Sequence, residues 1–113
     1  MLDDYSAEQV SGLLETISKP ARLRILSAIG QAEACVCHLE AVLGLRQSYI
    51  SQHLMALRSA GLLDTRREGR YVYYSLCDER ILALIAGAAE PRLLSAQAYF
   101  NRMQAEAQEE IGN

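Results

Sequence analysis

The 113-residue sequence lacks the features that would place it in a membrane or outside the cell. No stretch approaches the roughly 20 consecutive apolar residues that are needed to cross a bilayer. The first residues, MLDDYSAEQ, are acidic and do not follow the basic-then-apolar order of a secretion signal. The three cysteines are an odd number, which argues against the disulfide framework of a small secreted domain. We therefore expect a cytoplasmic protein that makes no membrane contact.

The common sequence signatures of enzymes are also absent. We find no Gly-rich phosphate loop, no HExxH motif and no nucleophile elbow. Ser51 and His53 are two residues apart on a predicted helix, so their side chains do not face each other. A thiol oxidoreductase would favour CxxC over the CxC found here. The sequence predicts a protein that is not an enzyme and that has no organic cofactor.

Internal repeats, low-complexity tracts and Gly/Ser linkers are missing, and half of the residues are hydrophobic. This composition favours one globular domain over residues 1–113. The net charge of −3 hides an uneven distribution. Residues 46–77 carry five arginines against Asp64 and Glu68, a local charge of +3 between two acidic flanks. A local basic segment of this kind is typical of a nucleic-acid contact.

Apolar residues recur with a helical period through the first half of the chain. Val10, Leu13, Leu14 and Ile17 form one helical stripe. Further helices are predicted over about 20–29, 36–43 and 47–59, each followed by a glycine. From Asp78 the helical pattern returns, Pro91 should divide it, and the polar tail beyond Gln104 is expected to fray.

The period changes to that of β-structure after the fourth helix. Two strands are predicted over 62–67 and 70–76, around a tight turn at Glu68-Gly69. Helix, turn, helix and basic hairpin follow each other in the order of a winged helix-turn-helix. The predicted fold class is therefore mainly α with a β-hairpin wing.

Four segments carry a close resemblance to a known family: KPARLRIL (19–26), ACVCHLEAVLGL (34–45), QSYISQHLMALRSAGLL (47–63) and REGRYVYYSL (67–76). Over roughly residues 16–85 the chain resembles the ArsR/SmtB family of metal-responsive transcriptional repressors. The resemblance implies a dimeric repressor that releases its operator DNA when an effector binds.

The fourth predicted helix supports DNA binding without that name. With Ile50, Leu54 and Leu57 turned inward, polar side chains point outward or flank that face: Gln47, Ser48, Tyr49, Ser51, Gln52 and His53. Gln bonds adenine in two places, and Ser and Tyr reach bases or phosphates. Arg66, Arg67 and Arg70 on the hairpin are expected to contact phosphate. A solvated helix face is the plain alternative.

The expected dimer is a symmetric homodimer of the first and last helices, which places two recognition helices about one DNA turn apart. Its apolar surface is predicted from the stripe that ends at Ile17 and from later residues: Ile81, Leu82, Leu84, Ile85, Leu93, Leu94 and Tyr99.

Cys35 and Cys37 at the start of the third helix match the CVC signature that the family uses for thiophilic ions. Thiolates suit soft ions such as As(III), Cd(II) or Pb(II), and a helix N-terminus lowers the pKa of a thiol. The resembled motif has a third cysteine five residues after the first, where this chain has Glu40. Cys77 is a candidate third ligand, because the segment before the third helix often pairs beside the second wing strand. A small packed residue is the alternative reading of Cys77.

We expect a thiophilic ion, As(III) first, to bind Cys35, Cys37 and Cys77 and to release the DNA. Two alternatives remain. The cysteines act as a redox switch, through a Cys35–Cys77 or intersubunit disulfide rather than the strained Cys35–Cys37 bridge. Otherwise the protein is a DNA-binding dimer without an effector.

Overall fold

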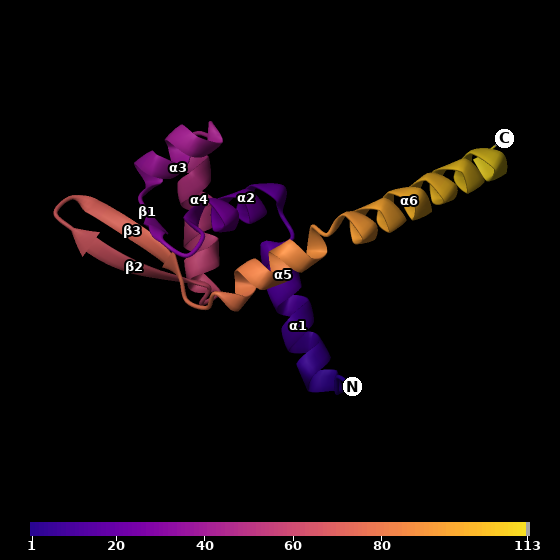
Figure 1. Cartoon of the computed structure of the whole chain (residues 1–113), viewed down its shortest axis with the longest axis horizontal. Coiled ribbons are helices and arrows are strands. Elements are labelled where there is room, and N and C mark those ends of the chain that lie inside the picture. The colour runs from indigo at the N-terminus through magenta and orange to yellow at the C-terminus, as the bar shows by residue number, and fades with distance from the viewer. Residues whose placement is uncertain (113) are drawn as a thin grey trace. The chain divides into compact units, whose positions relative to one another are not determined.

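The computed structural model describes the backbone of residues 1–112 and the side chains of residues 1–108. Helices dominate, and one three-stranded antiparallel sheet interrupts them (Figure 1). The elements in chain order are α1 Asp4–Ile17, α2 Pro20–Ile29, β1 Glu33–Ala34, α3 Val36–Leu43, α4 Gln47–Ser59, β2 Leu63–Glu68, β3 Tyr71–Leu76, α5 Arg80–Ala88 and α6 Pro91–Gly112. This arrangement confirms the predicted mainly α fold with a hairpin wing.

The chain divides into two compact units, Met1–Leu82 and a second unit that begins at Ala83. The first unit holds α1 to α4 and the whole sheet, and therefore every residue predicted to bind DNA or metal. The second unit contains most of α5 and all of α6. One domain with dimerisation helices at both ends stays a prediction.

The core of the first unit lies between α2, α3 and α4. Ile50, Leu54 and Leu57 of α4 are fully buried and follow each other at helical spacing, which confirms the inward face predicted for this helix. Their partners from α2 and α3 are Ile25, Leu26 and Leu39. The buried stripe fixes which side of α4 faces outward.

The sheet has the strand order β1-β3-β2. The wing, β2 and β3, is an antiparallel hairpin that projects beyond α3 and α4 in Figure 1. Gly69 turns the chain between the strands with a positive φ of 60°, a conformation that glycine adopts without steric cost. β1 joins the other edge of β3, with Glu33 opposite Ser75 and Ala34 opposite Tyr74.

The C-terminal helical region begins after Asp78 and is divided at Pro91, as predicted, but the predicted fraying of its end is wrong. Asp78 accepts a hydrogen bond from the backbone N–H of Arg80 at 2.9 Å, and α6 begins at Pro91. The helix then continues to Gly112 instead of fraying after Gln104. The last turns are rich in Ala, Glu and Gln, which are good helix formers even though Glu and Gln are polar.

Candidate nucleic-acid interface and cysteine pair

Helix α4 presents a continuous polar face on the side opposite its buried stripe. Gln47, Ser48, Tyr49 and Gln52 are exposed, and Ser51 at the edge of this face is half-buried. Ser48 and Gln52 are four residues apart, so their side chains are neighbours on the helix surface. Short polar groups on an exposed helix face suit the major groove, where base edges offer donors and acceptors.

His53 is an exception to the predicted DNA-facing set. Only 8% of the residue is exposed, and Arg22 of α2 donates from Nε to its Nδ1 at 3.1 Å. Position 53 lies beside Leu54 and three residues after Ile50, so its side chain joins the inner edge of the helix. The prediction that His53 contacts DNA directly is therefore wrong.

Met55 is a residue of this face that the sequence analysis missed. It is 67% exposed and lies three residues after Gln52, beyond the end of the polar stripe. The signal was its spacing from Ser48, which is seven residues and so two helical turns. A search for polar groups alone passes over it, although apolar side chains contact the methyl group of thymine.

Helix α4 begins without a side-chain cap. Its N-cap residue, Arg46, has an extended backbone and makes no capping hydrogen bond through its side chain. The amides of the first turn therefore lack a side-chain partner from the cap, and such amides attract anions together with the helix dipole. A shallow hollow of about 410 Å³ lies here, lined by Gly44, Leu45, Arg46, Ser48, Tyr49 and Gln52.

Arg66 on the wing has partners within the chain. Its guanidinium binds Glu33 of β1 through two nitrogens, at 2.6 and 3.2 Å, and Glu68 at 2.7 Å. It also lies over the ring of Tyr73, 4.7 Å from the ring centroid. These carboxylates raise the pKa of Arg66, and its guanidinium lowers the pKa of Glu33. Arg66 thus links β1 to the wing, a role that differs from the predicted phosphate contact.

Arg67 and Arg70 are the exposed basic residues of the wing that the ion pairs of residues 1–108 do not include. The guanidinium of Arg70 lies 5.4 Å from the ring centroid of Tyr71 and donates to its hydroxyl at 3.4 Å. This arrangement leaves the charge of Arg70 without a carboxylate partner in that part of the chain. Arg67 and Arg70 are thus the charges of the wing that no carboxylate of residues 1–108 neutralises.

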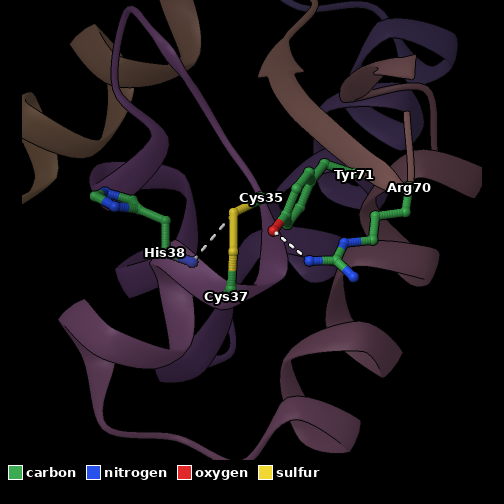
Figure 2. Close-up of a disulfide and its surroundings, with 5 residues drawn as sticks. All are labelled: Cys35, Cys37, His38, Arg70 and Tyr71. Atoms are coloured by element: carbon green, nitrogen blue, oxygen red, sulfur yellow. Dashed lines mark hydrogen bonds between the residues drawn. A yellow bond between two sulfur atoms is a disulfide. The ribbon is translucent and has the colours of Figure 1, made fainter. Parts of the chain in front are cut away.

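Cys35 and Cys37 are joined by a disulfide (Figure 2), with their Cα atoms 5.4 Å apart. The sequence analysis disfavoured this bridge. Cys35 is the N-cap of α3 and has an extended backbone, whereas Cys37 is in the first turn, and this change of direction brings the side chains together. The sulfur of Cys35 also accepts a hydrogen bond from the backbone N–H of His38 at 3.3 Å.

Cys77 does not join the other two cysteines. β1 and β3 are antiparallel with Ala34 opposite Tyr74, so the chain reaches Cys35 at one end of the pairing and Cys77 beyond the other. Cys77 is exposed, and partial desolvation and the carboxylate of Asp64 raise the pKa of its thiol. Among the side chains that the structure describes, those of residues 1–108, no group of three His, Cys, Asp or Glu is placed to hold a metal ion. The prediction that one subunit completes a three-thiolate site is wrong.

Comparisons with known proteins agree with this geometry. Residues 19–65 match the model of the family described as bacterial regulatory protein, arsR family. A biofilm growth-associated repressor of Agrobacterium fabrum is 43% identical over 79 residues, which cover 70% of this chain and 68% of that protein. The chain belongs to the arsR family of bacterial regulatory proteins.

Two other proteins extend the comparison. A transcriptional repressor SmtB homolog of Synechocystis is 39% identical over 84 residues, 74% of this chain and 64% of its own length. The structure of reduced HlyU from Vibrio cholerae matches with a TM-score of 0.70 and 34% identity, covering 75% of this chain and 90% of that one. The fold is therefore a winged helix of the arsR family.

The family membership tests two predictions, that the chain is a DNA-binding regulator and that it is not an enzyme. These relatives and structural neighbours are transcriptional regulators rather than enzymes, which confirms that the chain is a DNA-binding regulator and not an enzyme. None of the helices over residues 1–112 is long and apolar enough to cross a membrane.

Proposed function

We propose that this protein is a transcriptional repressor that binds double-stranded DNA as a symmetric homodimer. The observation that carries the proposal is the exposed polar face of α4 beside a wing with two unpaired arginines in the described chain, Arg67 and Arg70. The similar proteins of Agrobacterium fabrum and Synechocystis are both named repressors. Such a regulator would act in the cytoplasm, where bacterial DNA is accessible.

The proposal divides the interface into base-reading and phosphate-binding parts. Gln47, Ser48, Ser51 and Gln52 read base edges in the major groove, with Tyr49 at the side of the same face. Arg67 and Arg70 bind phosphate of the flanking backbone, and Arg66 supports them by holding the wing to β1. Arg46 and the uncapped first turn of α4 add a further anion contact.

Exposed apolar side chains in both units support the homodimer. In α1, Val10 and Leu14 are at least 40% exposed, although Ile17 of the same predicted stripe is buried in the core. In α6, large apolar residues are more than half exposed: Leu93, Leu94, Tyr99, Phe100 and Met103. Ile81 is buried and is removed from the predicted interface. Water-exposed apolar surface of this extent is typical of an association site.

The DNA-binding proposal is tested by selecting duplexes from a randomised library with the reduced protein. Fluorescence anisotropy then compares the selected duplex with a scrambled one at several salt concentrations. We expect tighter binding to the selected duplex, two-fold related half-sites about one DNA turn apart, and a dimer in sedimentation. Equal affinity for both duplexes, or a monomer at micromolar concentration, would contradict the proposal.

We further propose that the effector acts at Cys35 and Cys37, and that the strongest candidate is a thiophilic ion such as As(III). Their sulfur atoms are adjacent, so the reduced pair offers two thiolates to one soft ion. Solvent completes the coordination, because no third ligand side chain joins the pair in the described part of the chain. The donor set therefore fits a two-thiol site.

The position of the pair supports a coupling to the DNA interface. Cys35 caps α3, the helix that precedes and packs against α4. Arg70 and Tyr71 of the wing belong to the surroundings of the disulfide (Figure 2). A ligand that draws both sulfur atoms together would change the start of α3 and the environment of Arg70 at once.

The disulfide itself favours a second candidate, a redox switch at the same two residues. Oxidation by a peroxide would remove two electrons and two protons from the thiol pair and form the sulfur–sulfur bond, while hydrogen peroxide is reduced to two waters, or an organic peroxide to an alcohol and one water. A thiol reductant would reverse the step. The bridge in question is Cys35–Cys37, not the Cys35–Cys77 bridge that the sequence favoured.

One panel separates the two candidates. The affinity of the reduced protein for its selected duplex is measured with As(III), Sb(III), Cd(II), Pb(II), Zn(II) and hydrogen peroxide, and free thiols are titrated in parallel. Release by an ion with reversal by a chelating dithiol supports the ion sensor. Release by peroxide alone supports the redox switch, and release by none of them leaves a DNA-binding dimer without an effector at this pair.

A further inference from the structure

Arg22 forms a link between α1 and the recognition helix α4. The Nε of Arg22, in α2, donates to the Nδ1 of His53 at 3.1 Å, and its Nη1 donates to the backbone oxygen of Thr16 at 2.8 Å. One guanidinium thus joins the last turn of α1 to the middle of α4. Neither Arg22 nor His53 is used by the DNA contacts described above.

The direction of these hydrogen bonds fixes the protonation state of His53. A guanidinium has only donors, so Nδ1 must present its lone pair and the neutral ring carries its proton on Nε2. Burial and the positive charges of Arg22 and Lys19 lower the pKa of His53. The Nε2 atom is buried and has no hydrogen-bond partner in the described part of the chain. The imidazole is therefore held as a buried acceptor.

His53 also contacts the DNA-facing surface through Tyr49. The two rings are one helical turn apart on α4, with centroids 4.6 Å apart and planes at 88° to each other, an edge-to-face arrangement. Tyr49 is 45% exposed, whereas His53 is 8% exposed. The buried ring therefore supports the exposed one from beneath.

We propose that His53 and Arg22 are positioning residues, which set the orientation of α4 against α1 and hold Tyr49 in place for DNA. They act through Tyr49 and through the helix rather than by touching a base or a phosphate. The proposal rests on the DNA-binding function, and it adds a requirement for one hydrogen bond that lies inside the protein. A packing role alone would need only the volume of the imidazole.

The proposal has a consequence for pH. The charged and titratable groups around the imidazole are Arg22 and Lys19 at the start of α2 and the phenol of Tyr49, while α1 contributes the uncharged carbonyl of Thr16 to the same link. An unfolded histidine titrates near pH 6.5, and the folded group titrates lower. The link is therefore complete above about pH 6.5 and is lost as the pH falls through the lowered pKa.

Two substitutions of His53 separate positioning from packing. His53→Leu keeps most of the volume and removes the acceptor, whereas His53→Asn places an amide oxygen near the position of Nδ1 and cannot titrate. Affinity for the selected duplex is measured in steps from about pH 7.5 downward with the reduced dimer of residues 1–113. Circular dichroism and sedimentation confirm that each variant is folded and dimeric.

We expect His53→Leu to lose about 10- to 100-fold in affinity, the range that a hydrogen bond to a charged group provides. His53→Asn should stay within about threefold of the parent at the higher pH, and it should keep that affinity as the pH falls through the range in which the parent weakens. Arg22→Met should match His53→Leu, and the two losses should not add in the double variant.

The results that would overturn the proposal are distinct. If folded, dimeric His53→Leu binds like the parent, His53 is only a packing residue. If His53→Leu fails to fold, the pH profile of His53→Asn decides, because a profile identical to that of the parent would assign the pH effect to other groups and refute the proposal. If the parent itself does not prefer its selected duplex at the higher pH, the DNA-binding function fails, and the inference fails with it.

Discussion

The outward face of α4 and the start of α3 are the two regions that define this regulator, and they are built in different ways. The face of α4 follows from one helix alone, since Ile50, Leu54 and Leu57 are buried and Ser48 and Gln52 are not. The cysteine pair is also local in sequence, but its third candidate ligand depended on the register of two distant strands. The buried face of α4 and the pairing of the segment before α3 with the second wing strand were both predicted correctly, but the antiparallel direction of that pairing takes Cys77 away from Cys35.

This difference indicates how each function should respond to single substitutions. A DNA-reading face needs a preformed helix, and its side chains are independent of each other to a first approximation. A thiol site needs two sulfur atoms together, so the loss of either one abolishes it. Substitutions should therefore have graded effects in α4 and an all-or-none effect at Cys35 and Cys37.

The largest effect is expected at the cysteine pair. Cys35→Ser should abolish the effector response, which corresponds to about 3 kcal/mol of coupling and about two orders of magnitude in DNA affinity. Serine is a good N-cap, so the start of α3 should remain intact. Cys77→Ser is the control and should respond like the parent. If each of the three single Ser variants responded to the effector like the parent, an effector site at the cysteines would be refuted.

A base-reading residue should give a smaller and selective loss. Gln52→Ala should cost about 1–3 kcal/mol at one or two base pairs of the selected duplex. Competition binding against single-base variants of that duplex locates the affected positions. Gln9→Ala, on the exposed side of α1, is a matched control of the same chemistry. A loss of equal size on selected and scrambled DNA would show that Gln52 does not read sequence.

On the wing, substitution of an arginine without a carboxylate partner should have a different effect from substitution of a paired one. Arg67→Ala should weaken binding to every duplex and reduce the salt slope by about 0.9 for each phosphate that is no longer neutralised. Arg66→Ala should change the slope less, because its guanidinium is already bound to Glu33 and Glu68. Anisotropy at several salt concentrations measures both slopes. A larger change for Arg66 than for Arg67 would reverse the assignment.

Met55 should show the smallest effect. Met55→Ala should leave the free energy of unfolding within about 0.5 kcal/mol, since the residue is 67% exposed. DNA affinity should fall a few-fold, mainly on duplexes with thymine at the contacted position. Val42→Ala, which is 56% exposed on α3, is the control. A loss shared by both variants would indicate a general effect on the fold.

The sequence predicted the helices, the wing and the polar face because each depends on neighbours within one or two turns. The same local rules placed Asp78 before α5 and Pro91 at the start of α6. The sequence analysis misplaced His53 because it assigned the residue by its polar side chain. Its spacing of three residues from Ile50 and four from Leu57 puts it at the edge of the buried stripe, where Arg22 donates to it.

The register of distant strands accounts for the errors at Arg66 and Cys77, whereas the disfavoured Cys35–Cys37 bridge and the expected fraying after Gln104 are local errors. Glu33 and Arg66 are 33 residues apart and meet only because β1 and β2 both flank β3. The antiparallel register of β1 and β3 places Cys35 and Cys77 at opposite ends of that pairing. No periodicity in the sequence specifies such a register, because a two-residue shift along an antiparallel pair keeps the same alternation of faces.

The central claim is that α4 and the wing together form the DNA interface. It is tested most directly by comparing the amide NMR spectrum of the reduced, isotope-labelled dimer with and without its selected duplex. We predict that the largest shifts lie at Ser48 and Gln52 on α4 and at Arg67 and Arg70 on the wing. Unchanged amides at these four residues, with shifts clustered on another surface, would contradict the account.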